Sequence, residues 1–210
     1  MNPVKKVDGR AEKARLTRRK MLDAAGELFI ERGYGATALQ DVAERAGVAV
    51  QTIYFTFGNK RTLLKEVVDR TIAGDDEPIA TLDRPWFRQA LATATAEEHL
   101  RAHVNGTSAV LGRVAPIMKT LEAAAATDPG ISALWPQGEN PRLTIQSAAA
   151  TSLMSKPGAR NDVTVEHAAD VMFGLLSPEL YLLLVGERGW SPAQWEDWAL
   201  ETLRSQLCSV

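Results

Sequence analysis

The chain has 210 residues, of which 45% are hydrophobic and 24% are charged, and its formal net charge is -2. This composition provides enough apolar side chains for a buried core and excludes wholesale disorder, while the net charge indicates no class of partner. The single cysteine, Cys208, excludes an internal disulfide framework, and three histidines argue against a four-ligand zinc site.

The N-terminal third predicts an arm followed by four helices. Residues 1–15 are charged without periodicity, which is typical of a flexible arm. Apolar residues then recur at helical spacing until Gly33, and short helices are predicted over 39–46 and 50–57, with Gly47 between them. A longer helix is expected from Lys60. The stripe of the first helix consists of Met21, Leu22, Ala25, Leu28 and Phe29.

The rest of the chain also has helical periodicity, and no run of strand alternation is convincing. Helices are expected at about 85–95, 97–114, 116–127, 130–154, 165–187 and 191–207, separated mainly by proline and glycine. Ser191 before Pro192 is a typical helix start. The sequence therefore predicts an all-α fold of about nine helices, divided into an arm (1–15), a three-helix domain (16–60) and a helical body (61–210).

We expect no membrane segment and no signal peptide. The apolar stretches at 171–176 and 180–185 are separated by Ser177-Pro178-Glu179, so no window reaches the roughly 18 unbroken apolar residues of a membrane span. The charged N-terminus lacks an apolar signal region. These features predict a cytoplasmic protein, and no pattern in the sequence indicates a cofactor, a metal site or an enzyme active site.

Charge is distributed unevenly along the chain. Residues 1–70 contain 14 Lys and Arg against 9 Asp and Glu, a net charge of +5, whereas the remaining residues have a net charge of -7. A basic head suggests contact with a polyanion, although a solvated basic face is the simpler alternative.

Residues 37–60 predict a helix-turn-helix, because two short helices flank a tight turn and need a third helix to bury their inner faces. The second short helix would expose Gln51, Thr52, Tyr54 and Thr56, which can hydrogen-bond to bases or phosphates. Thr37, the first amides of the preceding helix and Lys60 could hold the DNA backbone. The alternative is a helical hairpin that serves only for packing. For the N-terminal arm two interpretations are open: it follows a minor groove, or it remains solvated.

Several motifs in this region resemble the N-terminal domain of TetR-family transcriptional regulators. They are FIERGY at 29–34, VAERAGV at 42–48, TIYF at 52–55 and FGNK at 57–60, and the resemblance covers about residues 15–70. The segment from Ser177 to Pro192 also resembles a C-terminal region found in actinobacterial-type members.

The resemblance implies a sequence-specific DNA-binding regulator with a body that binds a small molecule. It assigns backbone contacts to Thr37 and Gln40, base reading to Gln51 and Thr52, and phosphate contacts to Tyr54, Thr56 and Lys60. Ala49, Val50 and Thr56 depart from the residues common in the family. These departures predict more apolar contact with thymine methyl groups and fewer phosphate contacts.

Candidate pocket residues in the body are aromatic, sulfur-containing or imidazole side chains, although most would be core residues by default. His99 and His103 lie four residues apart, which suits a metal pair or, more simply, a pocket wall. The candidates are Trp86, His99, His103, Met118, Trp135, Met154, Met172 and Phe173.

The resemblance further implies a homodimer in which residues 165–187 and 191–207 of two chains form a four-helix bundle. It would bury Val171, Leu175, Leu182, Leu183, Trp195, Trp198 and Leu203. The predicted function is a homodimeric repressor that a small hydrophobic effector releases from a palindromic operator. The alternatives are an effector-independent or activating DNA-binding protein and, with less support, a helical enzyme that modifies a small molecule.

Overall fold

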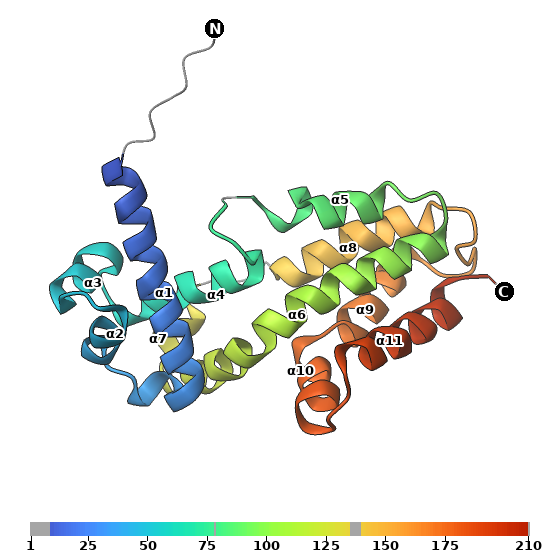
Figure 1. Cartoon of the computed structure of the whole chain (residues 1–210). Coiled ribbons are helices and arrows are strands. Elements are labelled where there is room, and N and C mark those ends of the chain that lie inside the picture. Colours follow the sequence, from blue (N-terminus) through green and yellow to red (C-terminus); the bar gives the residue numbers. More distant parts are fainter. Residues whose placement is uncertain (1–8, 78, 135–139, 210) are drawn as a thin grey trace, which may run out of the picture. The chain divides into compact units, whose positions relative to one another are not determined.

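A computed structural model describes residues 9–77, 79–134 and 140–209 of the chain (Figure 1). Apart from an isolated β-bridge between Ala159 and Cys208, the regular structure of these residues is helical. The predicted all-α fold is therefore confirmed for the part of the chain that the structure describes.

The helices pack into two compact units whose boundary differs from the predicted division at residue 60. The first unit extends to Arg70 and also takes in the segment that begins at Ile117, while the second contains residues 71–116 and resumes after the undescribed residues 135–139. The fourth helix joins the first unit because its apolar face is buried there. That face consists of Leu63, Leu64, Val67 and Val68.

Helix α1 (Gly9–Ala36) begins earlier than predicted, so residues 9–15 are helical and only residues 1–8 of the proposed arm lie outside the described residues. Residues 9–15 carry no apolar stripe. Ion pairing stabilises the helix instead, because Arg15 contacts Glu12 one turn earlier at 2.9 Å. Near the other end, Gly33 leaves helical geometry with φ 80° and ψ 160°, as its predicted role requires.

Helices α2 (Leu39–Ala46) and α3 (Val50–Phe57) have the predicted bounds. Gly47 adopts the left-handed conformation (φ 67°, ψ 38°) that a helix C-cap requires, and the Val48 amide closes the turn on the Ala43 carbonyl at 3.0 Å. Helix α4 (Lys60–Ala73) follows, with the Asn59 side chain accepting a hydrogen bond from the Thr62 amide. The shared core of α1, α2 and α3 comprises Met21, Leu22, Ala24, Ala25, Leu28, Phe29, Leu39, Val42, Ala43, Ile53 and Phe57.

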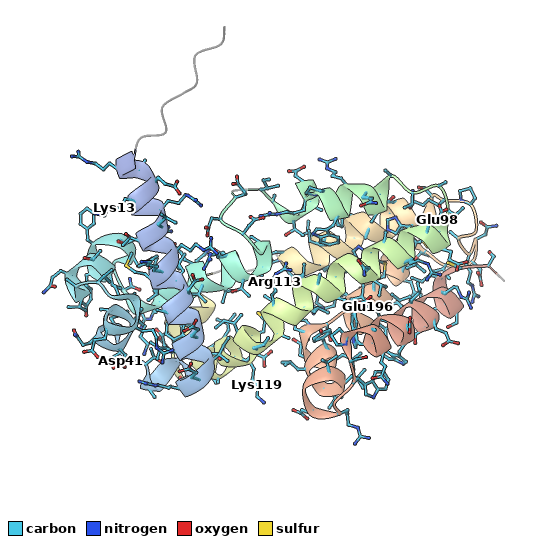
Figure 2. The ribbon with its side chains drawn as sticks, in the orientation of Figure 1. Lys13, Asp41, Glu98, Arg113, Lys119 and Glu196 are labelled. Carbon is cyan, nitrogen blue, oxygen red and sulfur yellow. The ribbon has the colours of Figure 1, made fainter. Side chains whose placement is uncertain are left out.

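The second unit consists mainly of helices that begin at a polar cap or a proline. After a short 3-10 turn come α5 (Pro85–Leu91), α6 (Ala96–Thr127), α8 (Pro141–Met154), α9 (Val165–Leu175), α10 (Pro178–Tyr181) and α11 (Pro192–Leu207). Ser191 caps α11 through a capping box with Gln194, which confirms the helix start predicted there. Figure 2 shows the side chains that these helices carry.

Several predicted helices differ from the structure. Pro116 does not end a helix but lies inside α6, and the boundary between the units falls directly after this residue, where one backbone hydrogen bond is missing. The helix expected over 130–154 is instead α7 (Pro129–Ser132) and α8, and the helix expected over 85–95 ends at Leu91.

The helix expected over 165–187 is also broken. α9 ends at Leu175, Ser177 takes an extended conformation and caps α10, and a π-helical segment, Leu182–Glu187, follows. By length and composition alone, Val165–Glu187 could cross a membrane, and 33% of its most apolar window is buried. The breaks show that it is not one straight helix, and much of its apolar surface is not covered by the chain itself.

Candidate nucleic-acid interface

The surface of interest is the outer side of α3, which the packing of the first unit leaves free. Ile53 and Phe57 point into the core, so the residues between them are turned outward. Tyr54 is 53% exposed and Gln51 is exposed on the same side of the helix. Thr52 and Val50 are half-buried at its edge. The structure therefore brings together most of the residues predicted to read DNA.

Phe55 also lies on this outer surface and was not identified from the sequence. Its side chain is 94% exposed, which is unusual for a large apolar residue. The helical spacing in the sequence could have indicated this exposure, because Ile53 and Phe57 already occupy the buried positions of the short helix. Phe55 extends the apolar character that Ala49, exposed at the helix start, and Val50 give to this surface.

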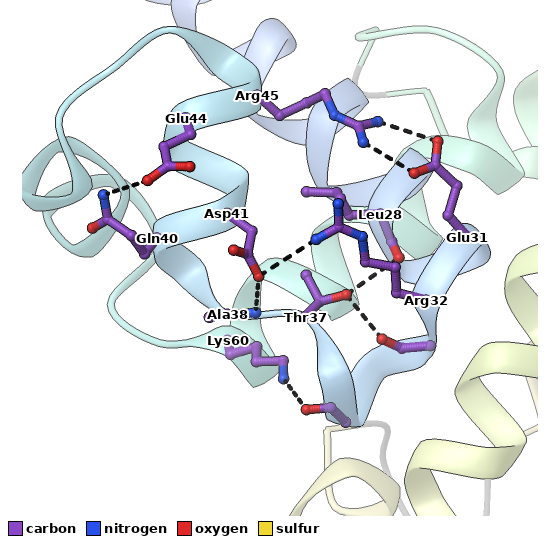
Figure 3. Close-up of polar contacts among 12 residues, drawn as sticks. Leu28, Glu31, Arg32, Thr37, Ala38, Gln40, Asp41, Glu44, Arg45 and Lys60 are labelled. Atoms are coloured by element: carbon purple, nitrogen blue, oxygen red, sulfur yellow. Dashed lines mark hydrogen bonds and ion pairs between the residues drawn. The ribbon is translucent and has the colours of Figure 1, made fainter.

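The Thr37 side chain does not have its predicted role. It is only 1% exposed, and its hydroxyl group lies 2.9 Å from the Gly33 carbonyl oxygen and 3.2 Å from that of Leu28 (Figure 3). The hydroxyl proton is therefore donated within the chain, and the group is closed to a phosphate. Thr37 instead ties the irregular end of α1 to the start of α2.

Thr56 is a second correction. Its hydroxyl group donates to the carbonyl oxygen of Thr52 at 2.7 Å, one turn earlier in α3. Phosphate oxygens accept hydrogen bonds, so a hydroxyl group whose proton is already donated elsewhere has no proton to donate to them. Gln40 remains exposed, with its amide nitrogen 3.2 Å from Glu44 Oε1 (Figure 3).

A shallow pocket of about 470 Å³ lies where α2 begins and α3 ends. Its lining comprises Gly35, Ala36, Thr37, Ala38, Leu39, Tyr54, Asn59 and Lys60. The Lys60 ammonium lies 4.3 Å from the centre of the Tyr34 ring and 3.4 Å from the Gly35 carbonyl oxygen. Partial burial lowers the pKa of Lys60, and the Asp41 carboxylate opposes this shift. A cation, a phenol and the first amides of a helix thus surround one hollow, an arrangement suited to an anion.

The Asp41 carboxylate limits how much positive potential this hollow has. It accepts a hydrogen bond from the Ala38 amide at 2.9 Å, and Arg32 approaches it at 4.0 Å (Figure 3). One of the free amides at the start of α2 is thereby already satisfied, so the hollow can hold an anion mainly through Lys60 and Tyr54.

Much of the positive charge of this unit is neutralised within it. Arg45 forms ion pairs with Glu27 and Glu31 at 3.2 and 3.0 Å. Arg70 pairs with Asp23, Arg61 pairs with Asp128, and Arg18 pairs with Glu66 while lying over the Phe57 ring. These paired arginines are therefore less available to a polyanion than unpaired basic side chains, although the net positive charge of residues 1–70 remains.

Residues 21–67, which contain this surface, match the family model for bacterial regulatory proteins of the tetR family. This part of the chain is similar to the N-terminal domain of TetR-family regulators. Similar relatives include the transcriptional regulator TtgR of Pseudomonas putida, 41% identical over 58 residues, and the transcriptional activator FasR of Mycolicibacterium smegmatis, 36% identical over 88 residues. These matches cover 28% and 41% of this chain, and only 28% and 36% of the respective relatives.

Solved structures show that the likeness of fold to the TetR family extends over nearly the whole chain. A TetR-family regulator from Mesorhizobium loti superposes with a TM-score of 0.71 at 22% identity, covering 93% of this chain and 98% of the other. The SmeT–triclosan complex gives 0.70 at 18% identity and 92% coverage of both chains. These values establish a TetR-like arrangement of helices.

The second unit contains most of the predicted pocket residues. His99 and His103 are completely buried on α6, and Trp86 lies beside His103 with 6.0 Å between ring centres. Met172 is buried as well, whereas Met154 and Phe173 are half-buried. Met118 belongs to the first unit and so cannot be grouped with the others, and Trp135 lies outside the described residues.

The predicted dimer residues divide into two sets. Trp195 and Leu203 are completely buried within the single chain, with the Trp195 ring packed edge-on against Tyr181 at 5.1 Å, so neither can contact a partner. Leu183 is 47% exposed. The others retain partly exposed side chains, namely Val171, Leu175, Leu182 and Trp198.

A second pocket, of about 680 Å³, lies beside the C-terminal end of α11. Its polar lining includes Glu97, Glu201 and Arg204, and none of the predicted effector-contacting residues. Cys208 also borders it, but burial raises the pKa of the thiol. A thiol in this state is a poor nucleophile, in keeping with the absence of any sequence pattern for catalysis.

Proposed function

We propose that this chain is a transcriptional regulator of the TetR family that binds a palindromic DNA operator as a homodimer. The observation that carries the proposal is the outer side of α3, where Gln51, Tyr54 and Phe55 are exposed together on a helix short enough to enter a major groove. The tight turn at Gly47 fixes this helix against α2. A hairpin used only for packing would not need to expose such a surface.

Each side chain has a distinct task in this proposal. Gln51 hydrogen-bonds to an adenine edge, while Phe55 and Val50 contact thymine methyl groups or deoxyribose. Tyr54 and Lys60 hold a phosphate over the hollow at the start of α2, and Gln40 reaches the neighbouring backbone. Contacts to phosphate position the head, and contacts to bases select the sequence.

The dimer would form through the apolar surface that α9, α10 and the π-helical segment leave exposed. Leu183 is 47% exposed, and Val171, Leu175 and Leu182 on the same elements are partly exposed. Trp198, on α11, is also partly exposed. Two heads would then meet successive major grooves, whose centres lie about 34–36 Å apart on one face of the duplex.

We further propose that a small hydrophobic effector regulates operator binding. The solved neighbour SmeT binds triclosan, which supports a similar capacity in the helical body of this chain. An effector that favours the state with wrongly spaced heads by about 3 kcal/mol would weaken operator binding roughly 150-fold. Repression by blocking access of RNA polymerase is the simplest outcome. Activation is the second candidate, because the relative FasR is an activator.

Selection of bound duplexes from a random DNA pool tests this function. We expect an inverted repeat, and we expect Gln51→Ala to cost about 1–3 kcal/mol on the selected site while leaving binding to random DNA nearly unchanged. Lys60→Ala should weaken binding to both and flatten the salt dependence. Gln89→Ala, at an exposed glutamine of α5, is the matched control. Equal losses for Gln51→Ala on specific and random DNA would contradict base reading.

A further inference from the structure

Two histidines in the second unit are buried in a manner that core packing does not explain. His99 and His103 stand one turn apart on α6, fully buried and stacked with 6.1 Å between ring centres. His103 Nε2 lies 2.9 Å from Oε1 of the buried Gln146 on α8. Among the described residues, neither nitrogen of His99 nor Nδ1 of His103 has a partner at normal hydrogen-bond distance and angle, although the Ala90 backbone lies close enough to His99 to affect its pKa. Three buried polar atoms thus face the interior unpaired.

Aromatic rings close the rest of this cluster. Phe87 on α5 is fully buried with its ring centre 5.9 Å from that of His103. Trp86, the next residue, lies 6.0 Å from His103 and packs so tightly over Gly106 that any Cβ at that position would overlap its ring. Trp86 is only half-buried, so it is the member of the cluster most accessible to solvent.

Both rings are neutral near pH 7. The pKa of each ring is lowered to about 4, mainly by burial. For His99, the neighbouring His103 and Lys156 contribute to the lowering, and the Ala90 backbone opposes it. For His103, the hydrogen bond with Gln146 opposes it. Because His103 Nε2 faces the amide oxygen, it carries the proton, and its Nδ1 presents a lone pair. His99 adds one donor and one acceptor.

The cluster has no charge to offer a charged ligand. The Lys156 ammonium already donates to the Leu91 carbonyl at 2.9 Å and the Thr93 carbonyl at 2.5 Å. The described residues contain no group of three or more His, Cys, Asp or Glu side chains that could hold a metal ion. An uncharged group that both donates and accepts a hydrogen bond can satisfy two of the three free ring nitrogens. A hydroxyl is the smallest such group.

We propose that His99 and His103 bind the hydroxyl group of a small neutral alcohol or phenol, whose apolar body packs against Trp86 and Phe87. The inference rests on the proposed function in one respect, since this ligand would be the effector. It goes further in naming the chemical class of the ligand and the atoms that select it. The hydroxyl proton goes to the lone pair of His103 Nδ1, and the oxygen accepts the N–H of His99.

Ring-nitrogen NMR on the full-length chain tests the proposal directly, because the protein has three histidines and the exposed His167 serves as an internal reference. The probes are phenol with toluene, and cyclohexanol with methylcyclohexane. We expect at least one hydroxyl compound to shift the unprotonated nitrogen resonance of His103 and leave His167 unchanged. It should bind about tenfold more tightly than its hydroxyl-free partner, the ratio that one hydrogen bond supplies.

His103→Phe should abolish this preference for the hydroxyl compound, whereas His167→Phe should preserve it. The proposal is overturned if neither hydroxyl compound moves the His99 or His103 signals of the wild-type chain, if each binds no better than its hydrophobic partner, or if zinc ions alone produce the shifts. The measurement contains no DNA. Failure of DNA binding in a separate assay would therefore count against the proposed function and not against this site.

Discussion

The hydroxyl group of Thr37 illustrates what residue type alone leaves open. A threonine before a short helix can contact a phosphate, or it can hydrogen-bond to a nearby carbonyl of its own chain. Burial of the side chain decides between the two, and the sequence alone does not determine this burial. Here the side chain is 1% exposed and bonded to the Gly33 carbonyl. Phe55 is the opposite case, since a large apolar side chain to which the sequence assigned no role proves to be 94% exposed.

Replacing Thr37 by valine tests its structural role. Thr37→Val keeps the shape but leaves the Gly33 carbonyl oxygen without its partner, which should lower the free energy of unfolding by roughly 1–2 kcal/mol. Binding to DNA at a temperature where both proteins are folded should change little. Urea titration and DNA binding measure the two effects, with the exposed Thr127→Val as control. Unchanged stability with weakened DNA binding would contradict the structural role and would support the phosphate contact predicted from the sequence.

The two buried histidines make a prediction about acid stability. Their pKa values are about 4 in the folded chain and near 6.5 when unfolded, so the unfolded chain binds more protons between these values. The free energy of unfolding should therefore be unaffected by them above pH 6.5 and fall as the pH drops toward 4. Between pH 7 and pH 5 the loss is about 2 kcal/mol for each ring.

Denaturant titrations at these two pH values check this, with the double variant His99→Phe, His103→Phe as comparison. The variant should lose much less stability on acidification than the wild type, and His167→Phe should behave as the wild type does. Parallel losses in all three proteins would show that the two rings are not held in the neutral form.

At the scale of the element, the bounds of α2 and α3 could be predicted because local signals and tertiary packing agree there. Apolar spacing, Gly47 and the short lengths all point to the same two helices. Further along the chain the agreement ends. Pro116 predicts a break, yet α6 continues through it, because contacts along a 32-residue helix outweigh the loss of one hydrogen bond. Ser177-Pro178 does break its segment, where Ser177 finds a capping role.

Gly47 should be the sensitive position of the helix-turn-helix. Its left-handed backbone costs an L-residue about 1–2 kcal/mol, so Gly47→Ala should lower the free energy of unfolding by about that amount. Gly35→Ala is a matched control, because Gly35 has no positive φ and no atom near its Cβ position. Thermal unfolding of the two variants provides the comparison. Equal effects would mean that the turn does not depend on the conformation of Gly47.

For the whole molecule, sequence periodicity could identify apolar helices but not which of them the chain buries by itself. Trp195 and Leu203 have the same spacing as residues of a dimer interface, yet both are buried within the core of one chain. Leu183 and its neighbours remain as the candidates. The compact units also differ from the predicted domain division, because the contribution of the segment from Ile117 onward to the first unit depends on contacts distant in sequence.

The most direct test of the account is the stoichiometry of the protein on a selected inverted repeat, measured by light scattering during size-exclusion chromatography. The account predicts two chains on one duplex, and it predicts that scrambling either half-site destroys the complex at the same protein concentration. A single chain bound with undiminished affinity to a lone half-site, or binding indifferent to the repeat, would contradict it.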